Sequence, residues 1–312
     1  MPRFGTSLPG VQQIPARAQA WERAIGGAQV LEAARAAERA GFDAVAVTDH
    51  PFPHDEWMRS GGHHALDPFV ALSFAAAATA RIRLLTFIYV LPYRNPFLSA
   101  KAAASLDVLS GGRFIFGVAA GYLEPEFAAL GVLFDERDDL ADEAIRAMKA
   151  AWGGEGVHFE GRHFVARGHT ALPRPLQQPH PPIWVGGNSK RAIRRAVLLG
   201  DGWMPIFNPA AHAGRRRTPA IESVADVSAR LTYAAEVARR AGRTRPLEVA
   251  ITARGLGSFG TTTFDQAAFL ADVAELRAAG VTYLVVNLPA ASRAEHVDRI
   301  ARFGDAVLAR LS

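Results

Sequence analysis

The chain has 312 residues, a formal net charge of +5 and no cysteine. Hydrophobic residues make up 49% of it and charged residues 21%, which excludes an intrinsically disordered chain. The lack of cysteine excludes disulfides, thiolate metal sites and a cysteine nucleophile.

Neither the charge nor the apolar content predicts a nucleic-acid or membrane partner. The basic residues are scattered over predicted helix faces without interleaved aromatic residues, so we expect no nucleic-acid binding. The most hydrophobic region, residues 69–91, contains Arg81 and Arg83, which favours a helix followed by a strand over a membrane span. The N-terminus has no signal-peptide apolar region, and we expect a cytoplasmic protein.

Eight apolar segments have the composition of buried parallel strands, and helices fit between them. A glycine joins a helix end to the next strand at Gly41, Gly200 and Gly280, which indicates repeated strand–helix units. Helices are expected at residues 21–40 and 97–109 and, last, at residues 294–311. The expected strands are residues 3–8, 44–48, 83–91, 113–118, 183–185, 202–205, 247–252 and 283–287.

This count predicts an α/β protein with a (β/α)8 TIM barrel, formed as one domain by residues 1–312. Three connections are longer than packing requires: residues 51–67, 152–182 and 208–219. The second of them contains an expected hairpin at residues 157–165. Functional side chains of such barrels lie at the carboxyl ends of the strands, so we expect the site and these insertions there.

Residues 81–126 carry a pattern that packing alone does not require. After Thr86, near the middle of a strand, come Leu-Pro-Tyr-Arg-Asn-Pro at residues 91–96 and Lys101. Leu-Asp-Val-Leu-Ser-Gly-Gly-Arg follows at residues 106–113, then Gly-Val-Ala-Ala-Gly at residues 117–121 and Glu126. This pattern resembles the luciferase-like family of flavin and deazaflavin oxidoreductases.

The resemblance implies a function. It implies that reduced deazaflavin (coenzyme F420), or alternatively FMN, binds at the strand ends. The cofactor would serve hydride transfer to, or monooxygenation of, a small organic substrate. Because residues 91–96 are more similar to deazaflavin-dependent members, we place F420 first. The family is often dimeric, so we also expect a homodimer.

Asp49 and His50 directly follow the second expected strand, where the family has an acidic residue and a histidine. The resemblance implies that His50 faces the cofactor ring and the substrate, and we predict both residues to be catalytic. An imidazole can donate or accept a proton near neutral pH. The residues alone leave another interpretation open, in which Asp49 caps a helix and His50 is merely exposed.

Cofactor contacts are implied at two loops. Family members carry a bulge with a non-proline cis peptide where this chain has Thr86, Phe87 and Ile88, and we predict the cis bond between Phe87 and Ile88. The sequence Gly186-Gly187-Asn188-Ser189 forms a strand-to-helix loop that resembles the family's phosphate site. By itself this loop is indistinguishable from an ordinary capped turn.

The remaining expected cofactor contacts are Asn95, Gly121 and Tyr122. Deazaflavin sugar-phosphate dehydrogenases of the family carry a glutamate proton donor where Tyr122 stands, so that reaction is not expected. Tyr122 is instead expected to stack or hydrogen-bond near the cofactor. We expect Glu126 to hold local structure by pairing with an arginine.

Two other functions stay open. The first is a non-catalytic flavin-binding protein, which the family also contains. The second is a metal-dependent hydrolase using His50, His54, His63 and His64. The chain has neither His-x-His after the first strand nor His-Glu-x-x-His, so we predict no metal site. Residues 215–217, three arginines, are expected to form a solvated loop rather than to meet an anionic cofactor tail.

Overall fold

The computed structural model describes residues 2–15 and 18–311 and contains a closed ring of parallel strands. The order around the sheet is β10-β11-β12-β13-β1-β3-β5-β7-β6, and pairing of β10 with β7 closes the ring. Because β5 and β6 are parts of one interrupted strand, the nine strands of this described sheet make eight positions, and the predicted (β/α)8 barrel is confirmed. The barrel strands are β1 (Arg3–Ser7), β3 (Ala44–Val47), β5 (Arg83–Thr86), β6 (Tyr89–Val90), β7 (Phe114–Ala119), β10 (Ile183–Gly186), β11 (Gly202–Met204), β12 (Glu248–Thr252) and β13 (Tyr283–Val286).

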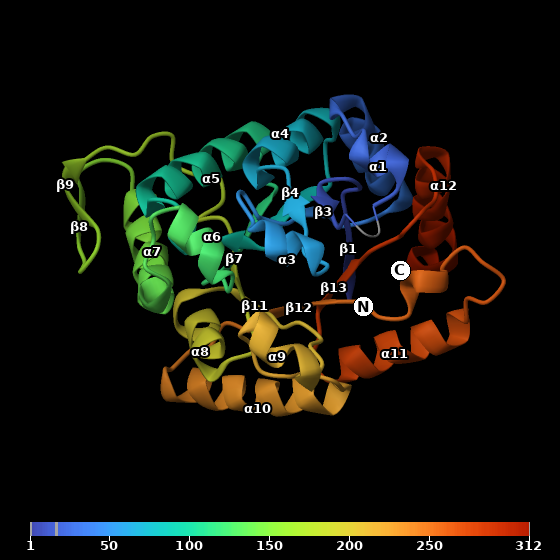
Figure 1. Ribbon diagram of the computed structural model, residues 1–312. Coiled ribbons are helices and arrows are strands. Elements are labelled where there is room, and N and C mark those ends of the chain that lie inside the picture. Colours follow the sequence, from blue (N-terminus) through green and yellow to red (C-terminus); the bar gives the residue numbers. More distant parts are fainter. Residues whose placement is uncertain (1, 16–17, 312) are drawn as a thin grey trace.

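Helices surround the strands as an outer ring (Figure 1). The order of strands around the barrel follows the chain, as expected when each strand connects through a helix to its neighbour. The longer helices of the ring are α2 (Gly27–Ala40), α4 (Pro68–Ala78), α5 (Pro96–Ser110), α7 (Arg137–Ala151), α8 (Lys190–Leu199), α10 (Val224–Arg240), α11 (Gln266–Ala278) and α12 (Arg293–Phe303).

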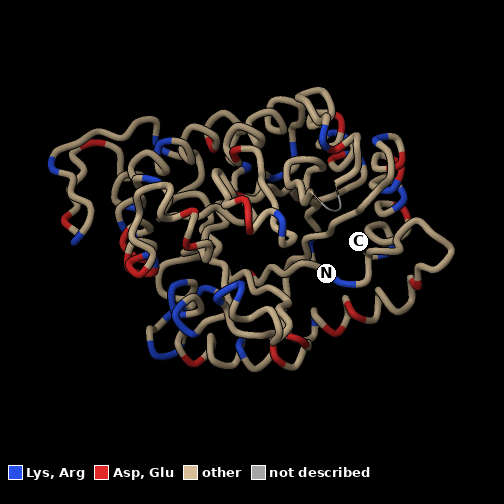
Figure 2. The backbone as a smooth tube through the Cα atoms, in the orientation of Figure 1, with Lys and Arg blue, Asp and Glu red and all other residues tan. Residues whose placement is uncertain are grey.

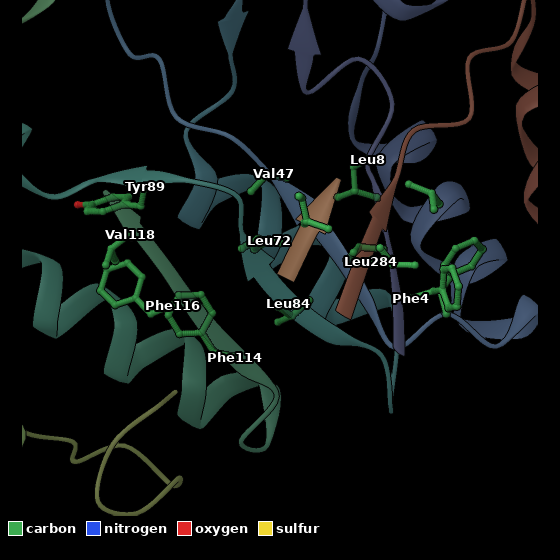
Figure 3. Packing of buried hydrophobic residues seen from close by; sticks show 14 of the residues in the cluster. Phe4, Leu8, Val47, Leu72, Leu84, Tyr89, Phe114, Phe116, Val118 and Leu284 are labelled. Atoms are coloured by element: carbon green, nitrogen blue, oxygen red, sulfur yellow. The ribbon is translucent and has the colours of Figure 1, made fainter. Parts of the chain in front are cut away.

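The hydrophobic core has two layers because side chains of a strand alternate between its faces. Along β7, Phe114, Phe116 and Val118 pack between strands and helices, whereas Ile115 points into the barrel. Figure 3 shows the three outward side chains of β7 on one side of the strand, with Tyr89 beside Val118. The inner layer fills the barrel with Ala44, Ala46, Leu85, Ile115, Trp184, Met204, Ala250, Tyr283 and Val285.

Further elements lie in the connections between strands and helices. The connection after β3 contains α3 (Asp55–Arg59) and β4 (His64–Ala65), and β4 pairs with β2 (Gln12–Gln13). Antiparallel strands β8 (Val157–Glu160) and β9 (Val165–His169) confirm the predicted hairpin, which projects at one edge of Figure 1. The other short helices are α1 (Ala20–Arg23), α6 (Glu124–Ala129), α9 (Ala210–Arg216) and α13 (Ala309–Leu311).

Two of the predicted helices are interrupted. The helix expected at residues 21–40 is split into α1 and α2, because Gly26 takes an extended conformation that ends one helix and precedes the next. The final helix is α-helical to Phe303 and then widens into a π-helical turn, Gly304–Leu308. Among the described residues, no helix is both long and apolar enough to cross a membrane.

Candidate functional site

A cavity of about 530 Å³ opens at the carboxyl ends of the barrel strands. Its floor lies above the inner core layer, against which Phe87 and Ile88 pack. The structure therefore brings together residues that are distant in sequence, as expected for this rim of a barrel. Nine of the twelve predicted site residues line the cavity: Asp49, His50, Phe87, Ile88, Gly121, Tyr122, Gly186, Gly187 and Ser189.

The strand expected at residues 83–91 is interrupted below this cavity. β5 pairs with β7 through Leu85 and Ile115, and β6 pairs through Tyr89 and Val118. Between these two pairs the interrupted strand advances by four residues and β7 by three, so the interrupted strand carries one extra residue. The peptide bond between Phe87 and Ile88 is cis, which confirms the prediction made for this bulge.

Thr86 supports the bulge and does not line the cavity, contrary to its predicted role as a cofactor contact. Its side chain is fully buried, and its hydroxyl donates to the carbonyl of Gly117 at 2.8 Å. A side chain at Gly117 has no room, because a Cβ there would lie 1.9 Å from the carbonyl oxygen of Thr86. The bulge therefore rests directly on β7.

His50 is the centre of a buried hydrogen-bonded chain. Its Nδ1 lies 2.8 Å from Glu126 Oε2, and its Nε2 lies 3.2 Å from the hydroxyl of Tyr122. Glu126 is fully buried and also accepts hydrogen bonds from the Tyr93 hydroxyl and from the N–H of Phe52, each at 2.8 Å. The prediction that Glu126 pairs with an arginine is wrong, since a histidine and two other donors satisfy its carboxylate.

This arrangement fixes which atoms of the three hydrogen-bonded side chains carry protons. A carboxylate has no proton to donate, so Nδ1 of His50 must carry the proton that Glu126 accepts. In the neutral imidazole, Nε2 is then an acceptor, and the Tyr122 hydroxyl donates to it. Burial raises the pKa of Tyr122 to about 12, with the charge of Glu126 adding to burial and that of Arg216 opposing it. The phenol therefore keeps its proton at neutral pH.

Asp49 is an anchor for the neighbouring loop. Both its oxygens accept from the Arg94 guanidinium, at 2.7 and 3.0 Å, and one also accepts from the N–H of Val90 at 3.0 Å. Asp49 and His50 are 2% and 5% exposed, so the alternative of a helix-capping Asp49 beside an exposed His50 is wrong. With its oxygens occupied, Asp49 is placed to position His50 rather than to exchange protons itself.

The loop after β10 was predicted to contact the cofactor phosphate, and three of its four predicted residues line the cavity. Gly186, Gly187 and Ser189 line the cavity, and Ser189 caps α8 by accepting from the N–H of Ala192. Asn188 does not line the cavity. It is fully buried, and its amide group donates to the carbonyls of Ile206 and Pro219 at 2.9 and 2.8 Å. Asn188 therefore holds the loop after β11 and is not a direct phosphate contact.

Asn95 does not line the cavity either, and a cofactor contact there stays a prediction. Its side-chain oxygen accepts from the N–H of Phe97 at 2.9 Å and caps α5, which begins with Pro96. The preceding residue, Arg94, is the functional residue of this segment because it neutralises Asp49. Its position after a buried strand was visible in the sequence, but its partner was not.

The loop between β3 and α4 covers His50. The rings of Trp57 and His63 both lie 4.6 Å from the His50 ring, measured between centroids. His63 lines the cavity, and no described residue hydrogen-bonds to its buried Nε2. The sequence identified His63 only within the metal hypothesis. Among the residues described, no group of three or more histidine, cysteine or acidic side chains is arranged to hold a metal ion.

We expect the His63→Asn variant to be less sensitive to acid than the wild type. Burial lowers the pKa of His63 from 6.5 to about 3, helped by the charges of His50, His64 and Arg216. Below pH 6.5 the unfolded chain binds a proton on this imidazole and the folded chain does not. The unfolding free energy therefore falls as the pH is lowered from 6.5 to 3. This loss is at most about 1.4 kcal/mol per pH unit.

Urea unfolding at pH 7.5 and pH 5.0 measures this effect. The loss of stability between the two pH values should be smaller in His63→Asn than in the wild type. The exposed neighbour provides the control, because His64→Asn should retain the wild-type dependence. Equal pH dependence in His63→Asn and the wild type would contradict the burial of His63.

Together these features define a class of protein. A parallel barrel with an open cavity at its carboxyl rim, and with an acid–base chain in the cavity wall, is the arrangement of a barrel enzyme. The family model described as luciferase-like monooxygenase matches residues 2–307, and the chain belongs to this family. Family membership supports an oxidoreductase.

Curated relatives match part of their length. The FMNH2-dependent dimethylsulfone monooxygenase of Pseudomonas putida is 33% identical over 179 residues, covering 56% of this chain and 47% of the relative. An uncharacterised protein of Mycobacterium tuberculosis is 34% identical over 191 residues, covering 55% of this chain and 65% of that protein. The matched region thus spans about half to two thirds of these relatives.

Solved structures share the fold over nearly the whole chain. A monooxygenase of Streptomyces bottropensis superposes with a TM-score of 0.79 at 23% identity, covering 99% of this chain and 100% of that one. An F420-dependent secondary alcohol dehydrogenase gives 0.72 at 18% identity, covering 99% and 98%. The coenzyme F420-dependent tetrahydromethanopterin reductase of Methanopyrus kandleri gives 0.74 at 17% identity, covering 100% and 99%.

Proposed function

We propose that the protein is an oxidoreductase that binds reduced F420 or FMN in the cavity and uses it on a small organic substrate. The observation that carries the proposal is the Glu126–His50–Tyr122 chain, whose phenol end lies in the cavity wall. Family membership and the FMNH2-dependent relative support it. Hydride transfer and monooxygenation are both compatible with this chain.

The cavity residues fit a flat cofactor with an anionic tail. A volume of about 530 Å³ lies within the usual range of small-molecule pockets. Gly186 keeps one wall open, because a Cβ there would lie 2.4 Å from Ile88 Cδ1. Near it, the N-terminus of α8 with Ser189, and Arg137 on the same cavity wall, would hold a phosphate.

When bound, the cofactor supplies the redox chemistry, as hydride donor or as the centre that activates oxygen. The protein's own residues orient the reactants and move a proton. Glu126 keeps the proton on Nδ1 of His50, so that Nε2 faces Tyr122. Tyr122 can pass its phenol proton to Nε2 while its oxygen takes a proton from a substrate hydroxyl, and in the reverse direction the imidazolium returns its proton through Tyr122 to a substrate oxygen. Trp57 and His63 cover His50 and keep water from it.

Two cofactors are candidates. We place F420 first because residues 91–96 resemble those of deazaflavin-dependent members. FMN is the second candidate, favoured by the curated relative whose name specifies FMNH2. The homodimer, the cytoplasmic location and the single domain over residues 1–312 stay predictions.

Cofactor titration tests this function. Purified protein is titrated with oxidised F420 and with FMN, and quenching of the cofactor's own fluorescence is measured. We expect saturable binding of at least one cofactor. Gly186→Val should weaken that binding by about tenfold or more, because the added methyl groups displace Ile88 into the cavity. Gly214, which has no atoms within 4 Å of an added Cβ, provides the control Gly214→Ala. If neither cofactor binds, the proposal is wrong.

A further inference from the structure

The connection after β11 forms one wall of the cavity and is held rigidly in place. Its end is fixed by Asn188, whose N–H donates to the Thr218 hydroxyl at 2.9 Å and whose amide group holds Ile206 and Pro219. Asn208 adds a bond from its side chain to the carbonyl of Thr218 at 2.9 Å. Arg215, Arg216 and Arg217 are therefore carried by an anchored segment, and all three are exposed, as the expectation of solvated arginines requires.

This wall is basic. In Figure 2, lysine and arginine gather along α8 and around α9, in the lower left of the view. Two arginines of this segment contact the rest of the protein: Arg215 donates to the Ser60 hydroxyl at 3.0 Å, and Arg217 pairs with Glu124 at 2.6 Å. Arg216, between them, lines the cavity. Arg217 also lines the cavity, but its guanidinium is bound to Glu124.

Three of the five described arginines that line the cavity have carboxylate partners. Carboxylates pair with Arg195, Arg217 and Arg254. Within the part of the chain that the structure describes, no ion pair involves Arg216. Among the same described residues, its hydrogen bonds are long ones, to the carbonyl of Phe207 at 3.4 Å and to Asn208 Oδ1 at 3.5 Å. An unpaired guanidinium facing a cavity attracts an anion.

The charge of Arg216 acts on the reactive end of the cavity. It lowers the pKa of Tyr122, against the larger effect of burial, and it adds to the burial that lowers the pKa of His63. Arg137, which begins α7, also lacks a carboxylate partner among the described residues, and it lies over the ring of Phe134 at 3.9 Å. Its neighbour Asp138 pairs with Arg195 of α8, which brings the start of α7 close to α8. Arg217 lies over the same ring at 4.6 Å, so Arg137 is also close to the segment that carries Arg216.

We propose that Arg216 binds an anionic group of the substrate, so that the protein acts on small carboxylates or sulfonates in preference to their uncharged analogues. This proposal rests on the proposed function, because the reactive part of the substrate would lie at Tyr122 while its anion meets Arg216. The unpartnered Nε2 of His63 on the same wall is available as a second contact. A charge-assisted hydrogen bond of this kind is worth about tenfold to a hundredfold in affinity.

Two pairs of probes test the charge preference: methanesulfonate with dimethyl sulfone, and benzoate with benzamide. Binding is followed by tryptophan fluorescence, to which Trp57 near His63 contributes, in FMN-loaded and in cofactor-free protein. We expect each anion to bind about tenfold or more tightly than its neutral partner. Arg216→Gln should abolish the preference. Arg239→Gln, which alters an exposed arginine of α10, should leave it unchanged.

A separate titration shows whether Arg216 binds a substrate anion or the cofactor phosphate. FMN and riboflavin are titrated into the wild type and Arg216→Gln, and the ratio of their affinities should be the same in both proteins. A ratio that collapses in Arg216→Gln would assign the guanidinium to the cofactor phosphate and overturn the proposal. The absence of any preference for the anions in the wild type would also overturn it. The measurement on cofactor-free protein shows whether this preference exists even if FMN does not bind.

Discussion

Replacement of His50 by glutamine is expected to lower turnover about a thousandfold while cofactor affinity changes by less than about threefold. Glutamine can still contact Glu126, but it cannot accept a proton from Tyr122 and return it at neutral pH. Turnover is measured as oxidation of the reduced cofactor by the best substrate of a panel of small carbonyl compounds, carboxylates and sulfonates. Fluorescence titration gives the cofactor affinity of each variant.

The exposed His54, which caps α3, provides a matched control. His54→Gln should turn over at the wild-type rate, because its side chain lies outside the hydrogen-bonded chain. Glu126→Gln should lose activity as His50→Gln does, because an amide no longer fixes the proton on Nδ1 of His50. Wild-type turnover in His50→Gln would remove the acid–base chain from the mechanism. A wild-type protein that binds cofactor and never turns over would instead support the non-catalytic alternative.

Replacement of Gly117 by alanine is expected to lower the unfolding free energy by about 3 kcal/mol or more. The added Cβ would lie 1.9 Å from the carbonyl oxygen of Thr86, so β5 and β7 would have to move apart. A backbone atom cannot move aside as the end of a flexible side chain can. The bulge that carries Phe87 and Ile88 packs on β7 through this contact. Urea denaturation followed by circular dichroism measures the change.

Gly214→Ala is the control for this variant. Gly214 lies within α9 and has no atom within 4 Å of an added Cβ, so alanine there should leave stability unchanged or raise it by about 0.5 to 1 kcal/mol. If the Gly117→Ala variant folds and loses less than about 1 kcal/mol, the close packing of the bulge on β7 is wrong. Cofactor affinity should fall together with stability in Gly117→Ala, because the cavity floor shifts.

The barrel was predictable because its signal is local. Each strand is a short apolar run, three of them follow a glycine at a helix end, and every expected strand appears in the structure within a few residues. The interruption of the strand at residues 83–91 did not follow from its composition, which is uniformly apolar. Only the resemblance to a family placed a bulge and a cis peptide there, and the structure has both.

The family pattern predicted which loops meet but not what each side chain does. Asn95 caps α5, Asp107 accepts from Gln177 at 2.7 and 3.0 Å, and Arg113 donates to backbone carbonyls, so these motif residues are structural. The partner of Glu126 could not be found by local reasoning, because Glu126 and His50 lie 76 positions apart and on different connections. Arg216 was inconspicuous for a similar reason. Arg215 donates to Ser60 and Arg217 pairs with Glu124, whereas Arg216 has no ion pair and only long hydrogen bonds in the part of the chain that the structure describes.

A crystal structure of the protein soaked with FMN and, separately, with F420 tests the central claim most directly. We predict a flat ring system over Phe87 and Ile88, with the Tyr122 hydroxyl facing the adjoining substrate space and the phosphate beside Ser189. A cavity closed by side chains, or a cofactor bound elsewhere on the molecule, would contradict the account.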